Sequence, residues 1–536
     1  MFKRLSIIYI ICMASLCSIS YEVVLARFVS IILDNEVLGQ SITIAVFLLG
    51  MGLGAVFYKK KKNLLKSLFQ LELSIAVFSS LLPFLILIII SFLDAHDLIR
   101  TSNLTTYRYD VIFGFIEILV LILGFLTGLE LPLFIDLGKE KEWDISTEKI
   151  LFINYLGSLF SILFIFMFLD LGVNSLLQII YLSIYNTIIL FVILLIAKFP
   201  YRIKVLVFIP VIFQFYAIKS FPTLYNLYKK TYYFSIKINS QSPDKYFDFL
   251  NVNEKFGNVT SIQTKYQEID LVESHSLINS IQNYDYTLYL DRNPQFSVDN
   301  VVVYHQSFAH VPIHLTKIQP EKVLVLGGGD GLLAHELLKY PTIKEIKIIE
   351  LDKRMVQVAE NEYQILKVNS NSLSNKRVNI VYENALSYIR KLSNQSIDAI
   401  FIDFPYPNNF ELLKLYSYEF YNEVYRVLSE KGFAILDAPV ISPDFPEIKE
   451  NDFLQLFFNT VTKSGFKTFF PFGTSEPFII LSKEETKLKF NYKKLPSLIG
   501  KRTYSNLISF EDVVSELKYD PRNINSIFRP GRFNNE

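Results

Sequence analysis

The chain has 536 residues, of which 51% are hydrophobic and only 20% are charged, so its composition is far from that of a soluble protein. Its formal net charge of +1 gives no argument for a protein that binds nucleic acid through overall charge. The two cysteines, Cys12 and Cys17, share the first apolar segment, which excludes a disulfide framework and a cysteine-built metal site.

The N-terminal part of the chain is a series of long apolar runs, most of them long enough to cross a bilayer as helices. The runs cover residues 6–33, 39–58, 71–92, 111–134, 150–169 and 176–197. A seventh run, 203–218, is shorter and contains Pro210. Because the first run continues past Ser20, we expect an uncleaved helix there rather than a signal peptide. The prediction is an α-helical transmembrane bundle of six to seven spans over residues 1–220.

Basic residues follow every second apolar run. They are Lys59–Lys62, Lys139 and Lys141, and Lys198, Arg202 and Lys204. By the positive-inside rule, the N-terminus and these loops face the cytoplasm. The C-terminal half lies outside if the seventh run also crosses, and it stays in the cytosol if that run lies in the interface. We expect a multi-pass protein of the cell membrane with its catalytic domain in the cytoplasm.

Charged residues inside the predicted spans are informative because a charge in hydrocarbon is costly. These residues are Glu22, Arg27, Glu117 and Glu130. One interpretation is a cavity or proton-linked site for a cationic solute; the other, which we favour, is packing pairs and snorkelling near helix ends. Gly50, Gly52 and Gly54 in the second run predict close packing between helices.

From about residue 240 the composition becomes that of a globular protein. Short alternating stretches at 257–264, 266–271 and 286–290 predict a small β-rich module within residues 221–317. Strands then alternate with helices in residues 318–485, which predicts a doubly wound α/β domain of the Rossmann-like, methyltransferase type. The predicted strands are 323–326, 346–349, 378–382, 399–402 and 433–436, and the predicted helices between them include 353–366, 385–392 and 420–428. Residues 486–536 form a C-terminal extension.

The first unit of this domain is a strand, a glycine turn, a helix and a second strand. Its turn, Gly327–Gly331, follows an apolar strand, and the second strand ends in Glu350. Glycines let a backbone approach a ligand closely, and a carboxylate about 20 residues beyond such a turn suits a ribose diol. The pattern therefore predicts a nucleoside site, although Glu350 could also be an ordinary acid at a strand end.

Two further predicted strand ends carry polar side chains. Asn384 could pair with the amino edge of an adenine, although Asn is also common in turns. Asp403 precedes a stiff turn with two prolines, where a carboxylate could hold an amine and accept its proton, or could simply cap a helix. Because carboxyl ends of parallel strands share one edge, we expect these groups to converge. Upstream, the valines 301–303 predict a strand that leads into Tyr304 and His305.

Several segments together resemble the spermidine synthase family of polyamine aminopropyltransferases. They are YQ (266–267), LDRNPQFSVDN (290–300), YH (304–305), VLVLGGGDG (323–331), IIELD (348–352), IDFPYPNN (402–409) and LYSYEFY (415–421). The segments YEVVLAR, FLLGMGLG, GLELPLF and NYLGSLF are similar to the bacterial members that carry an N-terminal multi-pass membrane domain. The resemblance therefore spans nearly the whole chain.

The resemblance implies an enzyme that moves the aminopropyl group of decarboxylated S-adenosylmethionine, a co-substrate, to an amine such as putrescine. It implies no permanent cofactor, no metal and no nucleic acid, with the lipid bilayer and a second copy of the chain as partners. By the same resemblance, the nucleoside site comprises Gln267, Gly327, Gly329, Asp330, Glu350, Asn384 and Ala385. The amine site comprises Tyr304, His305, Asp330, Asp403 and Tyr406, with Asp403 as the proton acceptor.

Three residues depart from the family pattern. Tyr406 stands where a second acid is usual, Asn384 where Asp is common and Gln306 where Glu is usual. All three lower the negative charge available to a dicationic amine, so putrescine is only the default acceptor. Two other functions stay open: a methyltransferase that uses intact S-adenosylmethionine, and a membrane sensor or transporter whose soluble half binds a polyamine or nucleoside.

Overall fold

The structure is a computed structural model, and it describes residues 2–33, 36–96, 105–241, 257–278, 281–298, 301–405, 407, 410–437, 452–473, 476–490, 498–504, 507 and 517–530. The chain forms two compact units. The first contains Met1–Tyr284 and Tyr289–Asn293, and the second contains Asp285–Leu288 and Pro294–Glu536.

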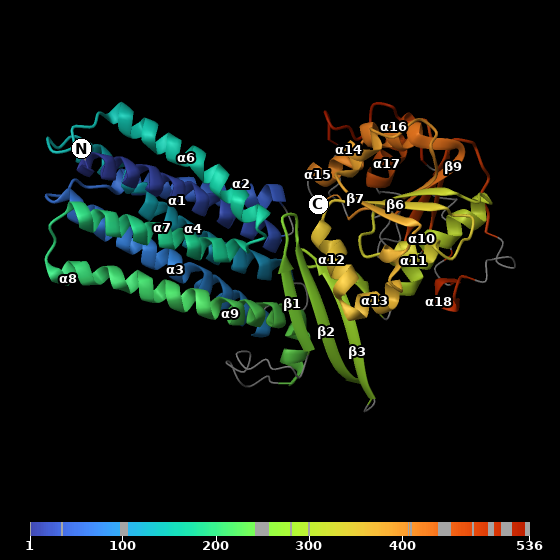
Figure 1. The fold of residues 1–536 in the computed structure, drawn as a ribbon, viewed down its shortest axis with the longest axis horizontal. Helices are drawn as coiled ribbons and strands as arrows, with labels where there is room; N and C mark the ends of the chain where they lie inside the picture. Colours follow the sequence, from blue (N-terminus) through green and yellow to red (C-terminus); the bar gives the residue numbers. More distant parts are fainter. Residues whose placement is uncertain are drawn as a thin grey trace. The chain divides into compact units, whose positions relative to one another are not determined.

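Long apolar helices run alongside one another in the first unit (Figure 1). They are α1 (Phe2–Leu33), α2 (Glu36–Phe57), α3 (Leu64–His96), α4 (Thr105–Gly128), α5 (Glu130–Gly138), α6 (Thr147–Asp170), α7 (Ser175–Ile196), α8 (Tyr201–Lys204) and α9 (Phe208–Gln241). Seven segments of the described part are long and apolar enough to cross a membrane, with α4 and α5 counted as one segment and α8 and α9 as another. Their buried aliphatic and aromatic side chains form one continuous core.

The seventh apolar segment is longer in the structure than its sequence run. Helix α9 begins at Phe208 and continues past Ile218 as far as Gln241. Pro210 lies in its first turn, where a missing backbone N–H leaves no intrahelical hydrogen bond unmade, so the proline begins the helix rather than ending it. The segment Tyr201–Phe234 therefore has the length of a full membrane crossing.

Close packing of α2 on α4 depends on two of the three glycines noted in the sequence. A Cβ added to Gly54 would lie 2.2 Å from the carbonyl oxygen of Phe125, and one added to Gly50 would lie 2.6 Å from that of Leu121. The prediction of close helix packing is confirmed at these two positions. It was wrong for Gly52, since a Cβ there meets no described residue within 4 Å.

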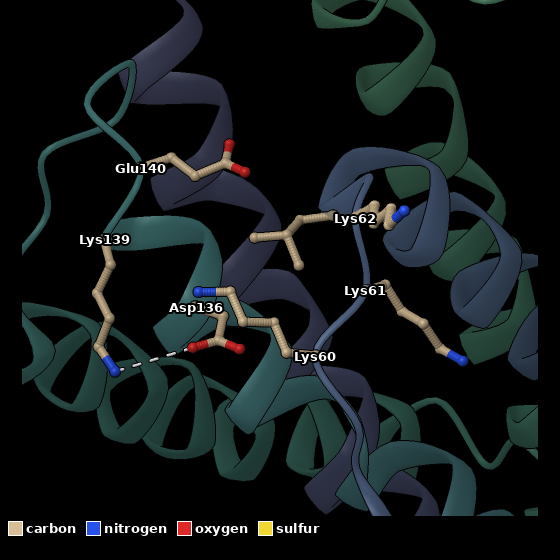
Figure 2. A pocket seen from close by; sticks show the side chains of 7 residues that line it. Lys60, Lys61, Lys62, Asp136, Lys139 and Glu140 are labelled. Atoms are coloured by element: carbon tan, nitrogen blue, oxygen red, sulfur yellow. Dashed lines mark ion pairs between the residues drawn. The ribbon is translucent and has the colours of Figure 1, made fainter.

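At one end of the bundle, the connection between α2 and α3 and the end of α5 surround an open hollow that contains several lysines (Figure 2). Asp136 of α5 accepts a hydrogen bond of 3.1 Å from the Tyr58 hydroxyl. The Lys139 ammonium lies 3.8 Å from the same carboxylate.

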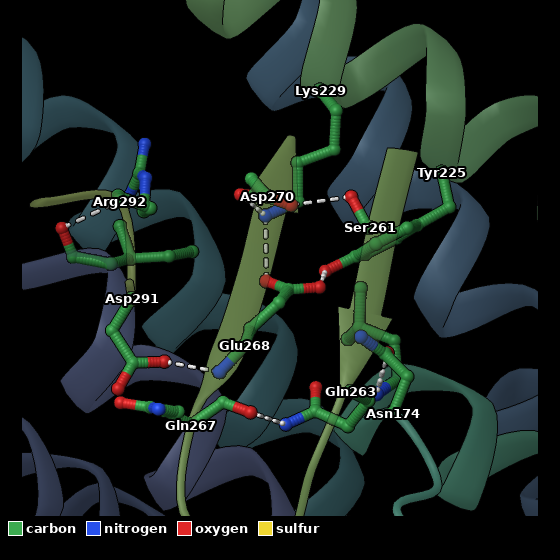
Figure 3. A network of polar contacts seen from close by, with 12 residues as sticks. Asn174, Tyr225, Lys229, Ser261, Gln263, Gln267, Glu268, Asp270, Asp291 and Arg292 are labelled. Carbon is green, nitrogen blue, oxygen red and sulfur yellow. Dashed lines mark hydrogen bonds and ion pairs between the residues drawn. The ribbon is translucent and has the colours of Figure 1, made fainter. Parts of the chain in front are cut away.

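A four-stranded sheet of order β1-β2-β3-β4 follows the helices. Its strands are β1 (Gly257–Gln263), β2 (Glu268–Ile278), β3 (Ile281–Leu290) and β4 (Asn293–Ser297). Lys229 of α9 is buried against this sheet, with its ammonium 2.6 Å from Glu268 and 2.7 Å from Asp270 of β2 (Figure 3). The hydroxyl of Ser261 on β1 also donates to Asp270. The network fastens α9 to the sheet through buried, paired charges.

A seven-stranded mixed sheet of order β10-β11-β9-β8-β5-β6-β7 forms the centre of the second unit. The strands are β5 (Lys322–Gly327), β6 (Glu345–Glu350), β7 (Val378–Tyr382), β8 (Ile397–Asp403), β9 (Leu428–Asp437), β10 (Thr468–Phe472) and β11 (Phe478–Ser482). The five predicted strands are confirmed and pair in parallel, whereas β11 pairs antiparallel with β9 and β10.

Helices cover both faces of this sheet. They are α10 (Val301–Thr316), α11 (Leu332–Leu337), α12 (Lys353–Asn361), α13 (Tyr363–Asn369), α14 (Ala385–Ile389), α15 (Phe410–Lys414), α16 (Tyr418–Val427) and α17 (Asp452–Lys463), with the short α18 (Lys501–Tyr504) near the end of the chain. Helices α14, α16 and α17 share one apolar core with the strands. On the other face, Phe308 of α10 packs against Phe401 of β8, at 5.6 Å between ring centroids. This layering confirms the predicted α/β class.

The prediction that valines 301–303 form a strand was wrong, because these residues begin helix α10. Val301, His305 and Phe308 are buried and recur at helical spacing. Burial of one helix face outweighs the weak preference of valine for strands. Tyr304 and His305 therefore belong to a helix that packs on one face of the sheet.

Candidate functional site

The carboxyl ends of the parallel strands place the predicted site residues side by side. Gly327 at the end of β5 is paired with Asp403 at the end of β8. Glu350 ends the strand on the other side of β5, opposite Tyr382 of β7. The register thus brings the glycine turn and two carboxylates to one edge, as the alternation of strands and helices predicted.

The glycine turn lies against both carboxylates. Gly327 has a φ of +89°, and an added Cβ would lie 2.1 Å from the carbonyl oxygen of Asp403. A Cβ on Gly329 would lie 2.8 Å from a carboxylate oxygen of Glu350. A side chain is excluded at Gly327 by the positive φ and the close backbone oxygen, whereas at Gly329 a Cβ would press on the Glu350 side chain, so the turn keeps its backbone close to both strand ends.

Glu350 accepts hydrogen bonds from backbone N–H groups. Its Oε1 accepts from Asp352 at 2.9 Å, and the backbone of Gly329 also donates to it. Burial raises the pKa of Glu350 to about 7, although these hydrogen bonds favour the carboxylate. A half-buried carboxylate at the tip of the second strand can accept two neighbouring hydroxyls, as the ribose prediction requires.

Asp403 and Tyr304 form the polar centre of the edge. The Tyr304 hydroxyl donates to Oδ1 of Asp403 at 2.7 Å and lies 3.3 Å from Oδ2 of Asp437. Burial, and then the charge of Asp330, raise the pKa of Asp403 to about 6, while the hydrogen bond from Tyr304 opposes the rise. Burial and the adjacent carboxylates raise the pKa of Tyr304, so its hydroxyl stays protonated as a donor.

Asp330 belongs to the same group of carboxylates. Its Oδ1 accepts a hydrogen bond of 2.9 Å from the backbone of Leu332 at the start of α11. Burial raises the pKa of Asp330 to about 6. Two acids with elevated pKa values next to each other form a pocket that would hold a cationic group more favourably than an anionic one.

His305 and Gln306 continue the helix beyond Tyr304. His305 is buried, its Nδ1 lies 2.8 Å from the Val301 carbonyl oxygen, and burial lowers its pKa, so the ring is neutral. Gln306 faces the C-terminal segment: its Oε1 accepts from the Gly500 backbone and from the Thr503 hydroxyl, each at 2.9 Å. Gln306, which stands where the family usually has Glu, thus holds the segment that contains α18.

The other predicted site residues have contacts of their own or are outside the described residues. Asn384 is exposed, and its side chain caps α14 by accepting from the Ser387 backbone at 3.1 Å; Ala385 begins that helix. Gln267 belongs to the first unit, where its carbonyl oxygen accepts from Gln263 (Figure 3). Tyr406 lies outside the described residues. The assigned roles of these residues stay predictions.

Sequence reasoning missed Asp437. This residue ends β9, where Leu436 pairs with Ile402, so it stands beside Asp403 at the same edge. The signal was available, because Asp437 follows a predicted apolar strand in the same way as Asp403 does.

The acids within the long apolar helices form a separate set. Glu22, Glu117 and Glu130 are buried, and so is Glu72, which the sequence analysis did not single out. Within the described residues, each of these four carboxylates has one oxygen without a hydrogen-bond partner. The Asn186 amide donates to Glu72 at 2.9 Å, and Thr43 donates to Glu117 at 2.6 Å. Both interpretations of these residues, a solute site and packing, stay predictions.

The second unit is an α/β domain with a glycine turn, an acid at the second strand end and a carboxylate–tyrosine pair beside them. These features are the ones expected of an α/β domain that binds a nucleoside at the carboxyl edge of a parallel sheet. Residues 301–460 match the family model for the spermine/spermidine synthase domain.

Curated relatives match over a larger part of the chain. The polyamine aminopropyltransferase of Oceanobacillus iheyensis is 29% identical over 435 residues, which cover 79% of this chain and 75% of the relative. Polyamine aminopropyltransferase 2 of Aquifex aeolicus is 29% identical over 78% of this chain and 76% of its own length. Polyamine aminopropyltransferase 2 of Bacillus cereus is 36% identical over 31% of this chain and 46% of its own length.

Among solved structures, spermidine synthase from Thermotoga maritima is 24% identical, with a TM-score of 0.37, over 49% of this chain and 84% of that one. The family model and the curated relatives agree: residues 301–460 match the spermine/spermidine synthase domain, and the chain is an aminopropyltransferase.

Proposed function

We propose that this aminopropyltransferase works in a membrane and moves the aminopropyl group of decarboxylated S-adenosylmethionine to an amine such as putrescine, giving spermidine and methylthioadenosine. The observation that carries the proposal is the 2.7 Å hydrogen bond between Tyr304 and Asp403 beside the glycine turn. It supplies an oriented carboxylate at the strand edge where a nucleoside is expected.

In the proposed reaction, the neutral nitrogen of the acceptor amine attacks the aminopropyl carbon that is bonded to the sulfonium. The nitrogen–carbon bond forms as the carbon–sulfur bond breaks. The electron pair stays on sulfur, which leaves as the neutral thioether of methylthioadenosine. The new ammonium then gives one proton to the Asp403 carboxylate. Because a sulfonium is already a good leaving group, the protein has to align the amine and accept its proton.

The environment of Asp403 suits a proton acceptor. With a pKa of about 6, the side chain is mostly ionised at neutral pH and is more basic than an exposed aspartate. Tyr304 orients it, and Asp437 adds a second carboxylate next to the same hydroxyl. His305, neutral and buried, borders the amine pocket.

The remaining residues are assigned to the donor. Glu350 accepts the ribose hydroxyls while Gly327 and Gly329 let the backbone approach the nucleoside; Gln267, Asn384 and Ala385 complete the nucleoside site. Asp330 receives the cationic end of the aminopropyl chain. Intact S-adenosylmethionine carries a carboxylate there, which Asp330 would repel, so this residue favours aminopropyl transfer over methyl transfer.

The proposed membrane location is supported by seven long apolar segments and by basic residues after every second one. An odd number of crossings puts the N-terminus and the catalytic half on opposite faces. A cytoplasmic catalytic half together with a cytoplasmic N-terminus therefore requires that one segment, such as the one containing α9, does not cross. Labelling of single cysteines introduced at Lys60 and at Lys376 in a variant without Cys12 and Cys17, in intact and then in permeabilised cells, decides between these topologies.

The function is tested with purified full-length protein, decarboxylated S-adenosylmethionine and a panel of amines, with methylthioadenosine followed by mass spectrometry. Turnover should require one class of amine and fall by roughly 100-fold or more in Asp403→Asn, as expected for loss of a general base. Asp398→Asn, at the opposite end of the same strand, is the matched control and should retain turnover.

If no amine gives methylthioadenosine although the protein binds the nucleoside tightly, the proposed transferase reaction is refuted and a sensor or transporter is favoured. A methylated product from intact S-adenosylmethionine would instead favour the methyltransferase. Full turnover in Asp403→Asn would remove that residue from its proposed role.

A further inference from the structure

The hollow between the α2–α3 connection and the end of α5 has an excess of positive charge. It has a volume of about 460 Å³ and is lined by Lys60, Lys61, Lys62, Leu64, Asp136, Lys139 and Glu140. Four lysines face two acids, and Asp136 already has partners in Tyr58 and Lys139. Within the described residues, Lys60, Lys61 and Lys62 are exposed and have no hydrogen-bond or ion-pair partner. Three ammonium groups are thus available to an anion.

An apolar hollow adjoins the basic one. It has a volume of about 320 Å³, and its lining includes Phe57, Leu71, Phe125, Leu129 and Leu133. Lys61 lines both hollows, so the cationic and apolar surfaces are continuous. In Figure 2, Lys60 extends toward Asp136 while Lys61 extends to the other side of the connection between α2 and α3.

The position of this pair of hollows matches the boundary of a bilayer. Helix α2 ends at Phe57 and α3 begins at Leu64, so the lysines lie where two predicted spans leave the hydrocarbon. The apolar hollow lies toward the spans, next to Phe125 of α4 and Leu133 of α5. A phosphate at the lysines would thus have its acyl chains on the side of the hydrocarbon.

We propose that this surface binds an anionic phospholipid, with the lipid phosphate among Lys60, Lys61 and Lys62 and part of one acyl chain in the hollow beside Leu129. The inference rests on the proposed membrane location, but it does not depend on the transferase chemistry. Anionic lipids concentrate in the cytoplasmic leaflet, which the basic loops are expected to face. The adjoining apolar hollow favours a lipid over free phosphate, because inorganic phosphate has no apolar group that could occupy it.

The test uses the fluorescence of the protein's single tryptophan. Trp143 is its single tryptophan, it is buried, and it lies in the turn after α5, where its backbone donates to the Glu140 carbonyl at 2.9 Å. Full-length protein would be reconstituted in phosphatidylcholine vesicles that contain increasing fractions of brominated phosphatidylglycerol or brominated phosphatidylcholine. Bromine quenches tryptophan at short range, so the ratio of the two quenching curves gives the preference for the anionic lipid.

We expect the native protein to prefer phosphatidylglycerol by about tenfold or more, since each lysine near the surface contributes on the order of fivefold. In the variant with Lys60→Gln, Lys61→Gln and Lys62→Gln the preference should disappear. The control with Lys198→Gln, Arg202→Gln and Lys204→Gln removes the same charge from another exposed basic segment, which includes α8, and should keep the preference.

Three results would overturn the proposal. Equal quenching by the two lipids in the native protein would show that no anionic lipid is selected. An equal loss in both variants would show general attraction to a charged surface. Loss of the preference when inorganic phosphate is added at low concentration would point to a phosphate site. Unchanged methylthioadenosine formation in the lysine variant would confirm that the fold and the transferase are intact.

Discussion

Tyr304→Phe separates the role of one hydroxyl from that of the ring that carries it. The ring packs against Phe308 and Phe478, at 5.6 Å and 5.1 Å between centroids, and phenylalanine keeps both contacts. The substitution removes the 2.7 Å hydrogen bond to Asp403 and the weaker 3.3 Å contact with Asp437. A hydrogen bond to a charged group contributes about 1.5–3 kcal/mol, and a shift of one pKa unit corresponds to about 1.4 kcal/mol.

The substitution should therefore raise the pKa of Asp403 by about one to two units from its starting value of about 6. A carboxylate whose pKa rises is protonated at higher pH, so the acid limb of the rate profile moves upward. The variant should be slower by roughly 5- to 50-fold near pH 6 and close to the native rate near pH 9. Ionisation of the amine substrate affects both proteins equally and cancels in the comparison.

The measurement is methylthioadenosine formation as a function of pH in the two proteins. Tyr340→Phe is the control, since it removes the hydroxyl that lies 2.9 Å from His310 Nδ1 and leaves Asp403 untouched. A loss of rate that is the same at every pH would refute the reasoning, because it would mean that the hydroxyl acts on the substrate rather than on the carboxylate.

Two further predictions concern the helical bundle and are read from denaturation in detergent. Gly54→Ala should destabilise the protein by about 1–3 kcal/mol, because the new Cβ overlaps the Phe125 carbonyl, whereas Gly52→Ala should not; equal stabilities would contradict the packing of α2 on α4. Lys229→Met should cost about 3–5 kcal/mol by leaving two buried carboxylates unpaired, and Lys230→Met, at the next and half-exposed position, should cost little; a tolerated Lys229→Met would mean that the ion pairs are not maintained.

Local patterns were enough to predict much of the soluble half. Strands β5 to β9 are apolar runs bounded by turn residues, and their order along the chain fixes which ends meet at one edge. Asp403, Glu350 and Gly327 could thus be placed together from the sequence. Strands β10 and β11 were not predicted; they are neighbours in sequence and pair with each other, but the pairing of β11 with β9 joins segments distant in the chain, which no local pattern records.

Other features depend on packing that no local pattern records. The valines before Tyr304 favour a strand by propensity, but they form a helix that buries Val301 and Val303 and leaves Val302 exposed. The pairing of Lys229 with Glu268 joins residues far apart in the chain, so neither residue stands out alone. The tasks of Gln306 and Asn384 also emerge only in the structure, where one holds the C-terminal segment and the other caps α14.

Asp437 bears on the question of how a pocket with fewer family acids could hold a dicationic amine. It stands at the strand end next to Asp403 and shares the Tyr304 hydroxyl at 3.3 Å. If it supplies the charge that Gln306 and Tyr406 lack, Asp437→Asn should raise KM for a diamine by about tenfold and change KM for a monoamine of equal length much less, with kcat retained. Equal effects on the two amines would assign Asp437 to the orientation of Tyr304 instead, and that role would appear as a shift of the acid limb.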